Sequence, residues 1–259
     1  MPSTLTRSIK DLCPYSLRKV LAGSKWWLHE RLSRRVEDAP RATSDTEARP
    51  VAGIFTDYYT RNHWGNDESR SGPGSTLFYT RSLRNNLPEL ISKLNITSML
   101  DLPCGDFHWM RTVDLAGVDY LGADIVEPLI HANRQQHAGP RRRFEVINLL
   151  EDQLPKVDII VCRDCLFHFS FQNVAKALAA IKHSGSIYLL TTTHPRGTNI
   201  NIATGRWFPI NLTAEPFNLP KPRQSIRDSA WGYRRRDMAL WRIEDIPNIT
   251  PQAPANHAA

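Results

Sequence analysis

One turn in the sequence joins a buried strand to residues that can bind a ligand. In SMLDLPCGDFHW, residues 98–109, an apolar run stops at Pro103 and Gly105 before an expected helix. Gly105 has no side chain, so a ligand can approach the backbone there, and the start of the helix offers free N–H donors. Asp101 and Asp106 can accept hydrogen bonds from a cationic amine. Ligands of open α/β sheets bind at such strand ends, so we expect a binding site here.

A further acid, Asp124, closes the predicted strand YLGAD nineteen residues after Gly105. An acid at the end of a second strand can accept hydrogen bonds from two ribose hydroxyls, in adenosylmethionine sites and in dinucleotide sites. A dinucleotide turn requires G-x-G-x-x-G, whereas residues 98–109 hold one glycine with an acid on each side. Two carboxylates repel a pyrophosphate and attract a sulfonium and an ammonium group, which favours adenosylmethionine.

The run CRDCLFHF, residues 162–169, ends the fourth predicted strand and carries candidate bases. A neutral histidine suits proton removal from a hydroxyl near pH 7, so we propose His168, with Asp164 orienting it or acting instead. His194, which ends the fifth predicted strand, competes with it, and a structural role is the alternative for each histidine. The two cysteines of the run lack a second Cys or His pair at metal spacing, so we interpret them as core residues and expect no metal.

The upstream stretch SGPGS, residues 71–75, is a glycine-rich turn before an expected helix over 75–94. Ser71 and Gly72, helped by Arg81, are candidates for binding an anionic group such as a cofactor carboxylate. The alternative is that the turn only caps the helix.

A long segment without clear periodicity, residues 195–231, follows the fifth predicted strand. Long loops of this kind are usually functional or disordered, and its aromatic content argues against disorder. Flat rings together with amides suit a sugar or another polyhydroxylated molecule as the acceptor of a methyl group from adenosylmethionine. The candidate acceptor residues are Trp207, Phe208, Asn211 and Trp231. The alternative is that the rings only attach the segment to the core.

The chain of 259 residues has a net charge of +7, which is unevenly distributed. Through residue 36 there are eight basic and two acidic residues, so this part contributes +6. Residues 15–35 have the pattern of a basic amphipathic helix, which either contacts an anionic membrane surface or packs on its own domain. Four cysteines and no long apolar run favour a cytoplasmic protein, soluble or at most membrane-associated.

Short apolar runs alternate with helical patterns from Val51 onward, as in βαβ units with a mostly parallel sheet. The predicted strands are 96–102, 119–125, 143–148, 157–164 and 185–194, with a strand-like run at 238–243, and the predicted helices are 75–94, 107–116, 127–137 and 172–184. We therefore divide the chain into a helical extension and flexible linker (1–50), one folded domain (51–246) and a disordered tail (247–259).

The order of these motifs resembles class I S-adenosylmethionine-dependent methyltransferases over roughly residues 55–245. The resemblance implies a Rossmann-like, doubly wound α/β fold with a seven-stranded sheet, and S-adenosylmethionine as cofactor. It also implies cofactor contacts, with Asp101, Pro103 and Gly105 at the methionine end, Asp124 at the ribose, and Asn148 and Leu149 at the adenine. Asn148 departs from the family, which often has Asp at that position.

The resemblance also bears on the acceptor. The fourth strand lacks the (Asp/Asn)-Pro-Pro-aromatic motif with which such enzymes methylate adenine or amide nitrogens, so O-methylation is favoured. The segments WGNDESRSGPGS, PINL and PFNLP are similar to bacterial sugar O-methyltransferases that modify fucose on nodulation factors. We expect a glycan or small-molecule acceptor. One alternative is nucleic-acid methylation, which the uneven charge disfavours, and the other is a non-catalytic subunit that binds adenosylmethionine.

Overall fold

A computed structural model of the chain describes residues 49–196, 198–228 and 236–249. The helix expected over 15–35, Trp231 and most of the tail expected from 247 lie outside these residues. Within the described ranges, no helix is both long and apolar enough to cross a membrane.

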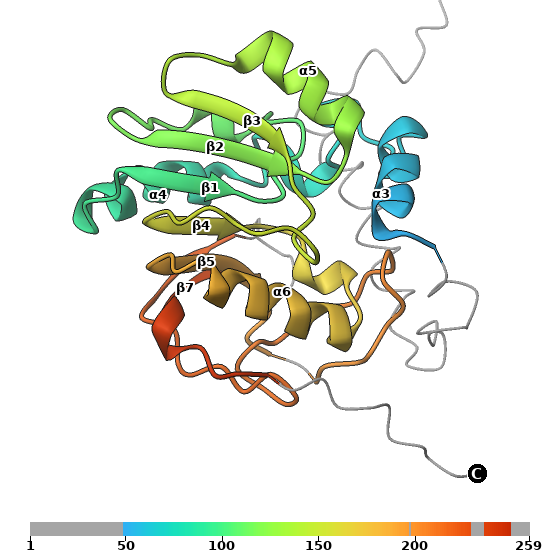
Figure 1. The fold of residues 1–259 in the computed structure, drawn as a ribbon, viewed down its shortest axis with the longest axis vertical. Helices are drawn as coiled ribbons and strands as arrows, with labels where there is room; N and C mark the ends of the chain where they lie inside the picture. The colour runs from blue at the N-terminus through green and yellow to red at the C-terminus, as the bar shows by residue number, and fades with distance from the viewer. Residues whose placement is uncertain (1–48, 197, 229–235, 250–259) are drawn as a thin grey trace, which may run out of the picture. The chain divides into compact units, whose positions relative to one another are not determined.

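The described residues contain a seven-stranded sheet (Figure 1). Its strands are β1 (Ser98–Asp101), β2 (Asp119–Asp124), β3 (Arg142–Val146), β4 (Ile159–Cys162), β5 (Tyr188–Thr193), β6 (Gln224–Arg227) and β7 (Asp237–Arg242). They lie in the order β3-β2-β1-β4-β5-β7-β6, parallel from β3 to β5, with β7 antiparallel to both of its neighbours. The predicted doubly wound, mostly parallel sheet is confirmed.

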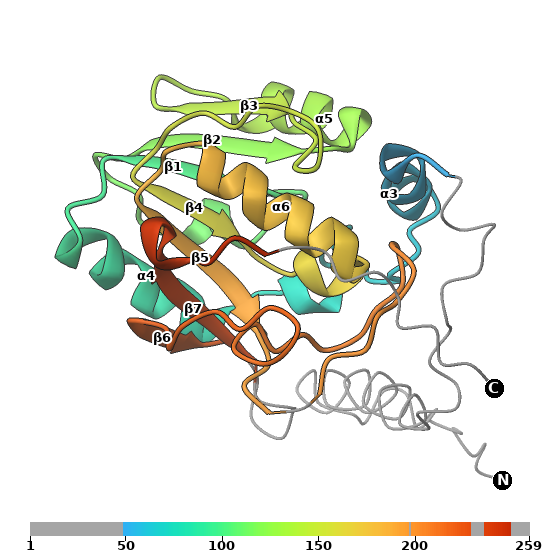
Figure 2. The ribbon, with the colours of Figure 1, turned by 60° about the horizontal axis from the view of Figure 1, so that its bottom comes forward.

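Helices cover both faces of the sheet. They are α4 (Arg81–Lys93), α5 (Glu127–His137) and α6 (Phe171–His183), whereas the further helix α3 (Val51–Thr60) covers neither face (Figure 1). Successive strand residues point to opposite faces, so Met99 and Val161 pack with α4 and α5, whereas Leu100 and Ile160 pack with α6. Figure 2 shows α6 lying across the sheet on the side away from α4, and Figure 1 shows α3 beyond the carboxyl ends of β1–β3. This edge of the sheet is where the candidate residues lie.

The helix predicted over 107–116 is wrong, because only a 3₁₀ turn at Met110–Thr112 forms there. The Asp106 carboxylate accepts a hydrogen bond from the His108 N–H at 3.3 Å, and Phe107 has a φ of 56°, outside the helical region. Burial of the Phe107 ring against Phe144, with ring centroids 5.2 Å apart, offsets the strain of that backbone. The predicted helix N-terminus above Gly105 therefore does not exist.

Three other elements differ from the predictions. The helix predicted over 75–94 begins only at Arg81, after a 3₁₀ turn at Pro73–Ser75. Strand β6 was not predicted, because Ile226 is the one buried residue in it and its residues show no apolar pattern. Helix α3 was also missed, because only Ile54 among its residues is fully buried, so it lacks a wide apolar stripe.

We predict that Gly122→Ala destabilises the sheet. A Cβ on Gly122 would lie 2.7 Å from Cδ1 of Phe144, a ring held in the core against Phe107. Such overpacking should lower the free energy of unfolding by about 1–3 kcal/mol, measured by urea denaturation. Gly139→Ala is the control, because a Cβ there meets nothing within 4 Å. Equal stability of the two variants would contradict the packing argument.

Candidate active site

Gly105 and Asp124 lie together at the carboxyl ends of β1 and β2, as predicted. The Gly105 N–H donates to Oδ2 of Asp124 at 3.1 Å, and the Val126 N–H donates to Oδ1 at 3.1 Å. Burial raises the pKa of Asp124 to about 6, although these N–H groups favour its ionised form. A carboxylate offers about four lone pairs, so Asp124 can still accept hydrogen bonds from a ligand.

Asp106 holds a neighbouring segment of the chain, Ser69–Ser71, which we call the strap. Its carboxylate accepts from the Ser69 hydroxyl at 2.9 Å, the Arg70 N–H at 2.7 Å and the Ser71 hydroxyl at 3.2 Å. The Ser71 hydroxyl in turn accepts from the Asp106 N–H at 2.9 Å. Asp106 is therefore already engaged by protein donors, whereas the sequence suggested a cofactor amine.

Gly105 is required because the strap lies so close to it. Its φ is 55°, and a Cβ there would stand 2.2 Å from Oγ of Ser71. Gly72 is similar, with a φ of 95° and its missing Cβ 3.0 Å from Cβ of Trp64. Ser71 thus lies at the turn after β1, whereas Arg81 is exposed in the first turn of α4, and their binding of an anionic group stays a prediction.

Asp101 points into the core. It is 1% exposed and accepts a hydrogen bond from the Tyr120 hydroxyl at 2.7 Å. Burial raises its pKa to about 7, against the effects of that hydroxyl and of Arg163. Pro103, which follows a cis peptide bond, is half-buried at the turn. The carboxyl group of Asp101 therefore holds Tyr120 in the core, and its contact with the methionine end of a cofactor stays a prediction.

The predicted adenine contacts lie in the loop after β3. The side chain of Asn148 accepts from the Leu150 N–H at 3.0 Å and donates to Glu151 at 2.8 Å, so it stabilises its own loop. Leu149 is buried in the core beneath that loop. Their contact with adenine stays a prediction.

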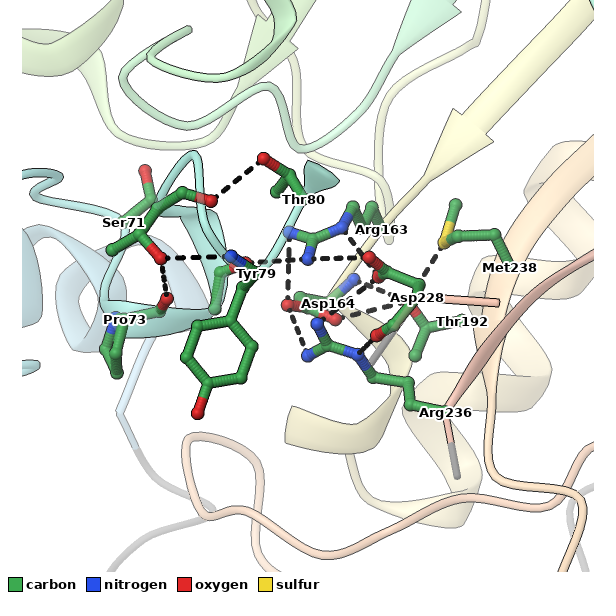
Figure 3. Close-up of polar contacts among 12 residues, drawn as sticks. Ser71, Pro73, Tyr79, Thr80, Arg163, Asp164, Thr192, Asp228, Arg236 and Met238 are labelled. Carbon is green, nitrogen blue, oxygen red and sulfur yellow. Dashed lines mark hydrogen bonds and ion pairs between the residues drawn. The ribbon is translucent and has the colours of Figure 1, made fainter. Parts of the chain in front are cut away.

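Four charged side chains form a buried network at the end of β4 (Figure 3). Arg163 donates to Asp228 at 2.8 Å and to the Gly74 carbonyl at 2.7 Å, and it lies 3.2 Å from Asp164. Arg236 donates to Asp164 at 2.9 Å and to the Asp228 carbonyl at 2.7 Å. Two arginines and two aspartates give this network no formal net charge, although burial raises the pKa of Asp228.

Asp164 does not orient His168, as the sequence suggested it could. Burial would raise its pKa, but Arg163 and Arg236 lower it more, so it is an ionised member of the network. The Nδ1 atom of His168 instead lies 2.9 Å from the carbonyl of Arg206. A carbonyl only accepts, so Nδ1 carries the proton and Nε2 has the free lone pair.

His168 is surrounded by aromatic rings. The centroid of its ring lies 4.6 Å from that of Phe167, 5.1 Å from Trp64 and 6.2 Å from Phe55. Burial lowers its pKa to about 4, against the raising effects of the Arg206 carbonyl and the Asp164 charge. The imidazole is therefore neutral near pH 7.

His194 has the opposite arrangement. Its Nδ1 accepts a hydrogen bond from the Ile210 N–H at 3.2 Å, and its own backbone N–H donates to the Ile210 carbonyl at 2.6 Å. In the neutral ring the proton is then on Nε2. Of the two candidate bases, only His168 holds a lone pair on Nε2 in this arrangement.

The segment after β5 packs on the core through several predicted acceptor residues. Trp207 lies edge-on to Phe167 at 5.9 Å, and the Phe208 N–H donates to the Phe167 carbonyl at 3.1 Å. The side-chain oxygen of Asn211 accepts from the Thr213 N–H at 3.1 Å. The contacts of Trp207 and Phe208 support attachment of the segment to the core, whereas Asn211 stabilises its own loop, and acceptor binding stays a prediction.

Sequence reasoning missed important parts of the site. Trp64 begins the segment WGNDESRSGPGS, but its contact with His168 had no local signal. Asp228 and Arg236 had no local signal either, because Arg163 lies 65 residues before Asp228 and Asp164 lies 72 residues before Arg236. The interpretation of Cys162 and Cys165 as core residues is confirmed. Across the described ranges, no three His, Cys, Asp or Glu side chains gather to hold a metal ion.

No protein-family model and no curated protein matches this chain by sequence. Solved structures do resemble it. One is a 1,6-didemethyltoxoflavin-N1-methyltransferase from Burkholderia thailandensis with bound S-adenosylhomocysteine. It has a TM-score of 0.55 and 20% identity, and the match covers 79% of this chain and 92% of that one.

Two further structures agree with this match. The N-methyltransferase NodS from Bradyrhizobium japonicum WM9 has a TM-score of 0.54 and 13% identity, covering 71% of this chain and 97% of its own. Magnesium protoporphyrin IX methyltransferase from Synechocystis PCC 6803 has a TM-score of 0.53 and 14% identity, and the match covers 74% of this chain and 95% of that one. At these identities the likeness establishes the fold, which is that of class I methyltransferases.

We predict that Arg163→Met strongly destabilises the protein. It would leave Asp228, which is 0% exposed, without its closest cation, and a buried pair broken on one side loses about 3–5 kcal/mol. The control is Arg141→Met, which removes an exposed ion pair with Asp119 worth at most about 1 kcal/mol. Urea denaturation measures both variants, and an equally small loss in each would show that the network does not stabilise the fold.

Proposed function

We propose that this protein is an S-adenosylmethionine-dependent methyltransferase that methylates a hydroxyl group of a neutral, polyhydroxylated acceptor such as a sugar. The observation that carries the proposal is the state of His168. Its ring is neutral, its Nδ1–H is bound to a backbone carbonyl, and its Nε2 can accept a proton at the carboxyl edge of a class I methyltransferase sheet. A hydroxyl acceptor needs such a base.

The residues around Asp124 fit the proposed cofactor. When bound, S-adenosylmethionine supplies a methyl group on a sulfonium, activated for in-line attack by a nucleophile. Asp124 would accept hydrogen bonds from the ribose hydroxyls with its remaining lone pairs. Gly105 and the strap would hold the methionine end, where Asp101 and Asp106 favour positive charge. The loop of Asn148 and Leu149 would border the adenine.

His168 would act on the acceptor rather than on the cofactor. Its Nε2 takes the hydroxyl proton as the acceptor oxygen becomes methylated, and its low pKa keeps the ring ready to accept a proton near pH 7. The nearby negative charge of Asp164 favours the imidazolium that forms. The Arg206 carbonyl continues to accept from Nδ1–H in both states.

The surroundings of His168 support a neutral acceptor. The rings of Trp64, Phe55 and Phe167 lie near that of His168, and Trp207 lies edge-on to Phe167. The charged network beside them is balanced, so it offers no net attraction for phosphates. A sugar ring stacks on aromatic rings without requiring a counter-charge.

The sequence supports a more specific form of this proposal. The similarity of its segments to fucose O-methyltransferases of nodulation factors favours a glycan or lipid-linked sugar as acceptor. The basic segment 15–35 would bring the protein to an anionic membrane surface if that sugar is lipid-linked. The net charge of +7 is the observation that favours the alternative, a nucleic-acid acceptor.

Binding of S-adenosylhomocysteine should depend on ionised Asp124. Below about pH 6 the carboxyl group is protonated and accepts ribose hydroxyls less well, so affinity should rise between about pH 5 and pH 7 and then level off. Asp124→Asn should weaken binding at neutral pH by about tenfold or more and flatten this dependence. Calorimetric titration measures both effects.

The control is Asp119→Asn, at the opposite end of the same strand, which should bind like wild type. Folded wild-type protein that fails to bind would contradict the cofactor assignment. Equal binding by Asp124→Asn and wild type at neutral pH would contradict the role of the acid.

Turnover should depend on His168 far more than on His194. In His168→Asn, the amide can still donate to the Arg206 carbonyl but cannot act as a base, so kcat should fall by about 100-fold or more. The matched variant His194→Asn keeps an acceptor for the Ile210 N–H, and its kcat should fall much less. Transfer of labelled methyl to monosaccharides and p-nitrophenyl glycosides measures activity, with single-stranded RNA and DNA as competing acceptors.

Equal losses in the two histidine variants would remove His168 as the base. Labelling of RNA or DNA but of no glycoside would favour the nucleic-acid alternative. Cofactor binding without transfer to any acceptor in this panel would favour a non-catalytic binding subunit.

A further inference from the structure

The four-residue turn 203–206 binds both the backbone and the ring of His168. The Gly205 N–H donates to the His168 carbonyl at 2.8 Å, and the Arg206 carbonyl accepts from the His168 ring at 2.9 Å. The turn is closed by the Arg206 N–H, which donates to the Ala203 carbonyl at 3.1 Å. The direction of one carbonyl in this turn therefore determines which ring nitrogen of His168 carries the proton.

Two elements hold this turn through hydrogen bonds. On the α6 side, the Thr204 hydroxyl accepts from the Ser170 N–H at 3.1 Å and from the Asn173 amide at 2.8 Å. On the α3 side, the Tyr58 hydroxyl donates to the Gly205 carbonyl at 2.9 Å. That carbonyl belongs to the peptide unit directly before Arg206, so Tyr58 restrains the backbone that aims the Arg206 carbonyl.

Close packing reinforces the contact between α3 and the turn. Gly205 is buried and has a φ of 95°, where a side chain is strained. A Cβ there would lie 2.8 Å from Cγ2 of Ile54 and 3.4 Å from the Tyr58 hydroxyl. The glycine thus lets helix α3 approach closely enough for the Tyr58 hydroxyl to reach the turn.

We propose that Tyr58 is a positioning residue for His168, acting through the Gly205 carbonyl to hold the turn that selects the tautomer with a free Nε2. The catalytic consequence rests on the proposed function, whereas the effect on the tautomer does not. Without the hydroxyl, the Gly205–Arg206 backbone loses its only described hydrogen bond from α3, and the Nδ1–H contact of His168 loosens. The ring then populates the tautomer with a proton on Nε2, which cannot accept one.

The packing of the Tyr58 ring is separate from this role. The ring stacks on His63 with centroids 4.0 Å apart and meets Phe55 and Trp64 edge-on at 5.9 and 5.3 Å. A phenylalanine keeps all three contacts. Tyr58→Phe therefore removes the hydroxyl while leaving the aromatic packing around His168 in place.

The test is Tyr58→Phe in the full chain, with Tyr59→Phe as the matched control on the next residue of the same helix. Long-range ¹H–¹⁵N spectra of the histidine rings report the tautomer of His168, and His168→Asn assigns its signals. Wild type and Tyr59→Phe should show a predominant Nδ1–H form, and Tyr58→Phe should show an increased Nε2–H fraction. With a glycoside acceptor, kcat should fall about three- to tenfold in Tyr58→Phe, with KM unchanged.

These outcomes separate the two proposals, because the spectra need neither cofactor nor acceptor. A shifted tautomer in a protein that methylates nothing would support the positioning role and contradict the proposed function. An unchanged tautomer in Tyr58→Phe, or the same shift in Tyr59→Phe, would overturn the positioning role whatever the activity.

Discussion

The buried ion pair between Arg163 and Asp228 is the interaction on which the rest of the site depends. It joins the end of β4 to the end of β6, and Arg163 also holds the Gly74 carbonyl, just downstream of the strap. Three segments that are distant in the sequence thereby meet at one guanidinium group. The 3₁₀ turn Leu166–His168 begins three residues after Arg163, so the same contact helps to position the ring of His168.

Burying four charges is favourable only when each finds a partner, and that requirement explains the local backbone. Asp164 adopts a φ of 53° and turns its carboxylate toward Arg163 and Arg236. The network also requires a glycine at position 74, because a Cβ there would lie 2.9 Å from Oδ2 of Asp164. The balanced charges also leave His168 in a weakly polar, aromatic environment, which is the cause of its low pKa.

The sequence was sufficient to predict the features that depend on local patterns. It was not sufficient for features that depend on contacts between residues distant in the sequence. Buried strands are continuous apolar runs, and a glycine and an acid at two strand ends must meet at one edge, so the sheet and the Gly105–Asp124 contact were predictable. The helix after β1 was not correctly predicted, because Asp106 binds the strap and its own turn instead. Asp164 was assigned to His168 because the two are close in sequence, whereas its partner Arg236 lies 72 residues away.

The two histidines at the strand ends show why residue type alone could not settle the chemistry. Both are buried, both follow parallel strands, and both contact the same segment after β5. That segment presents a carbonyl to Nδ1 of His168 and an N–H to Nδ1 of His194, so the backbone assigns them opposite tautomers. One ring is left with an acceptor on Nε2 and the other with a donor. Which ring nitrogen can accept a proton is therefore decided by the direction of two backbone peptide groups, which no side-chain pattern records.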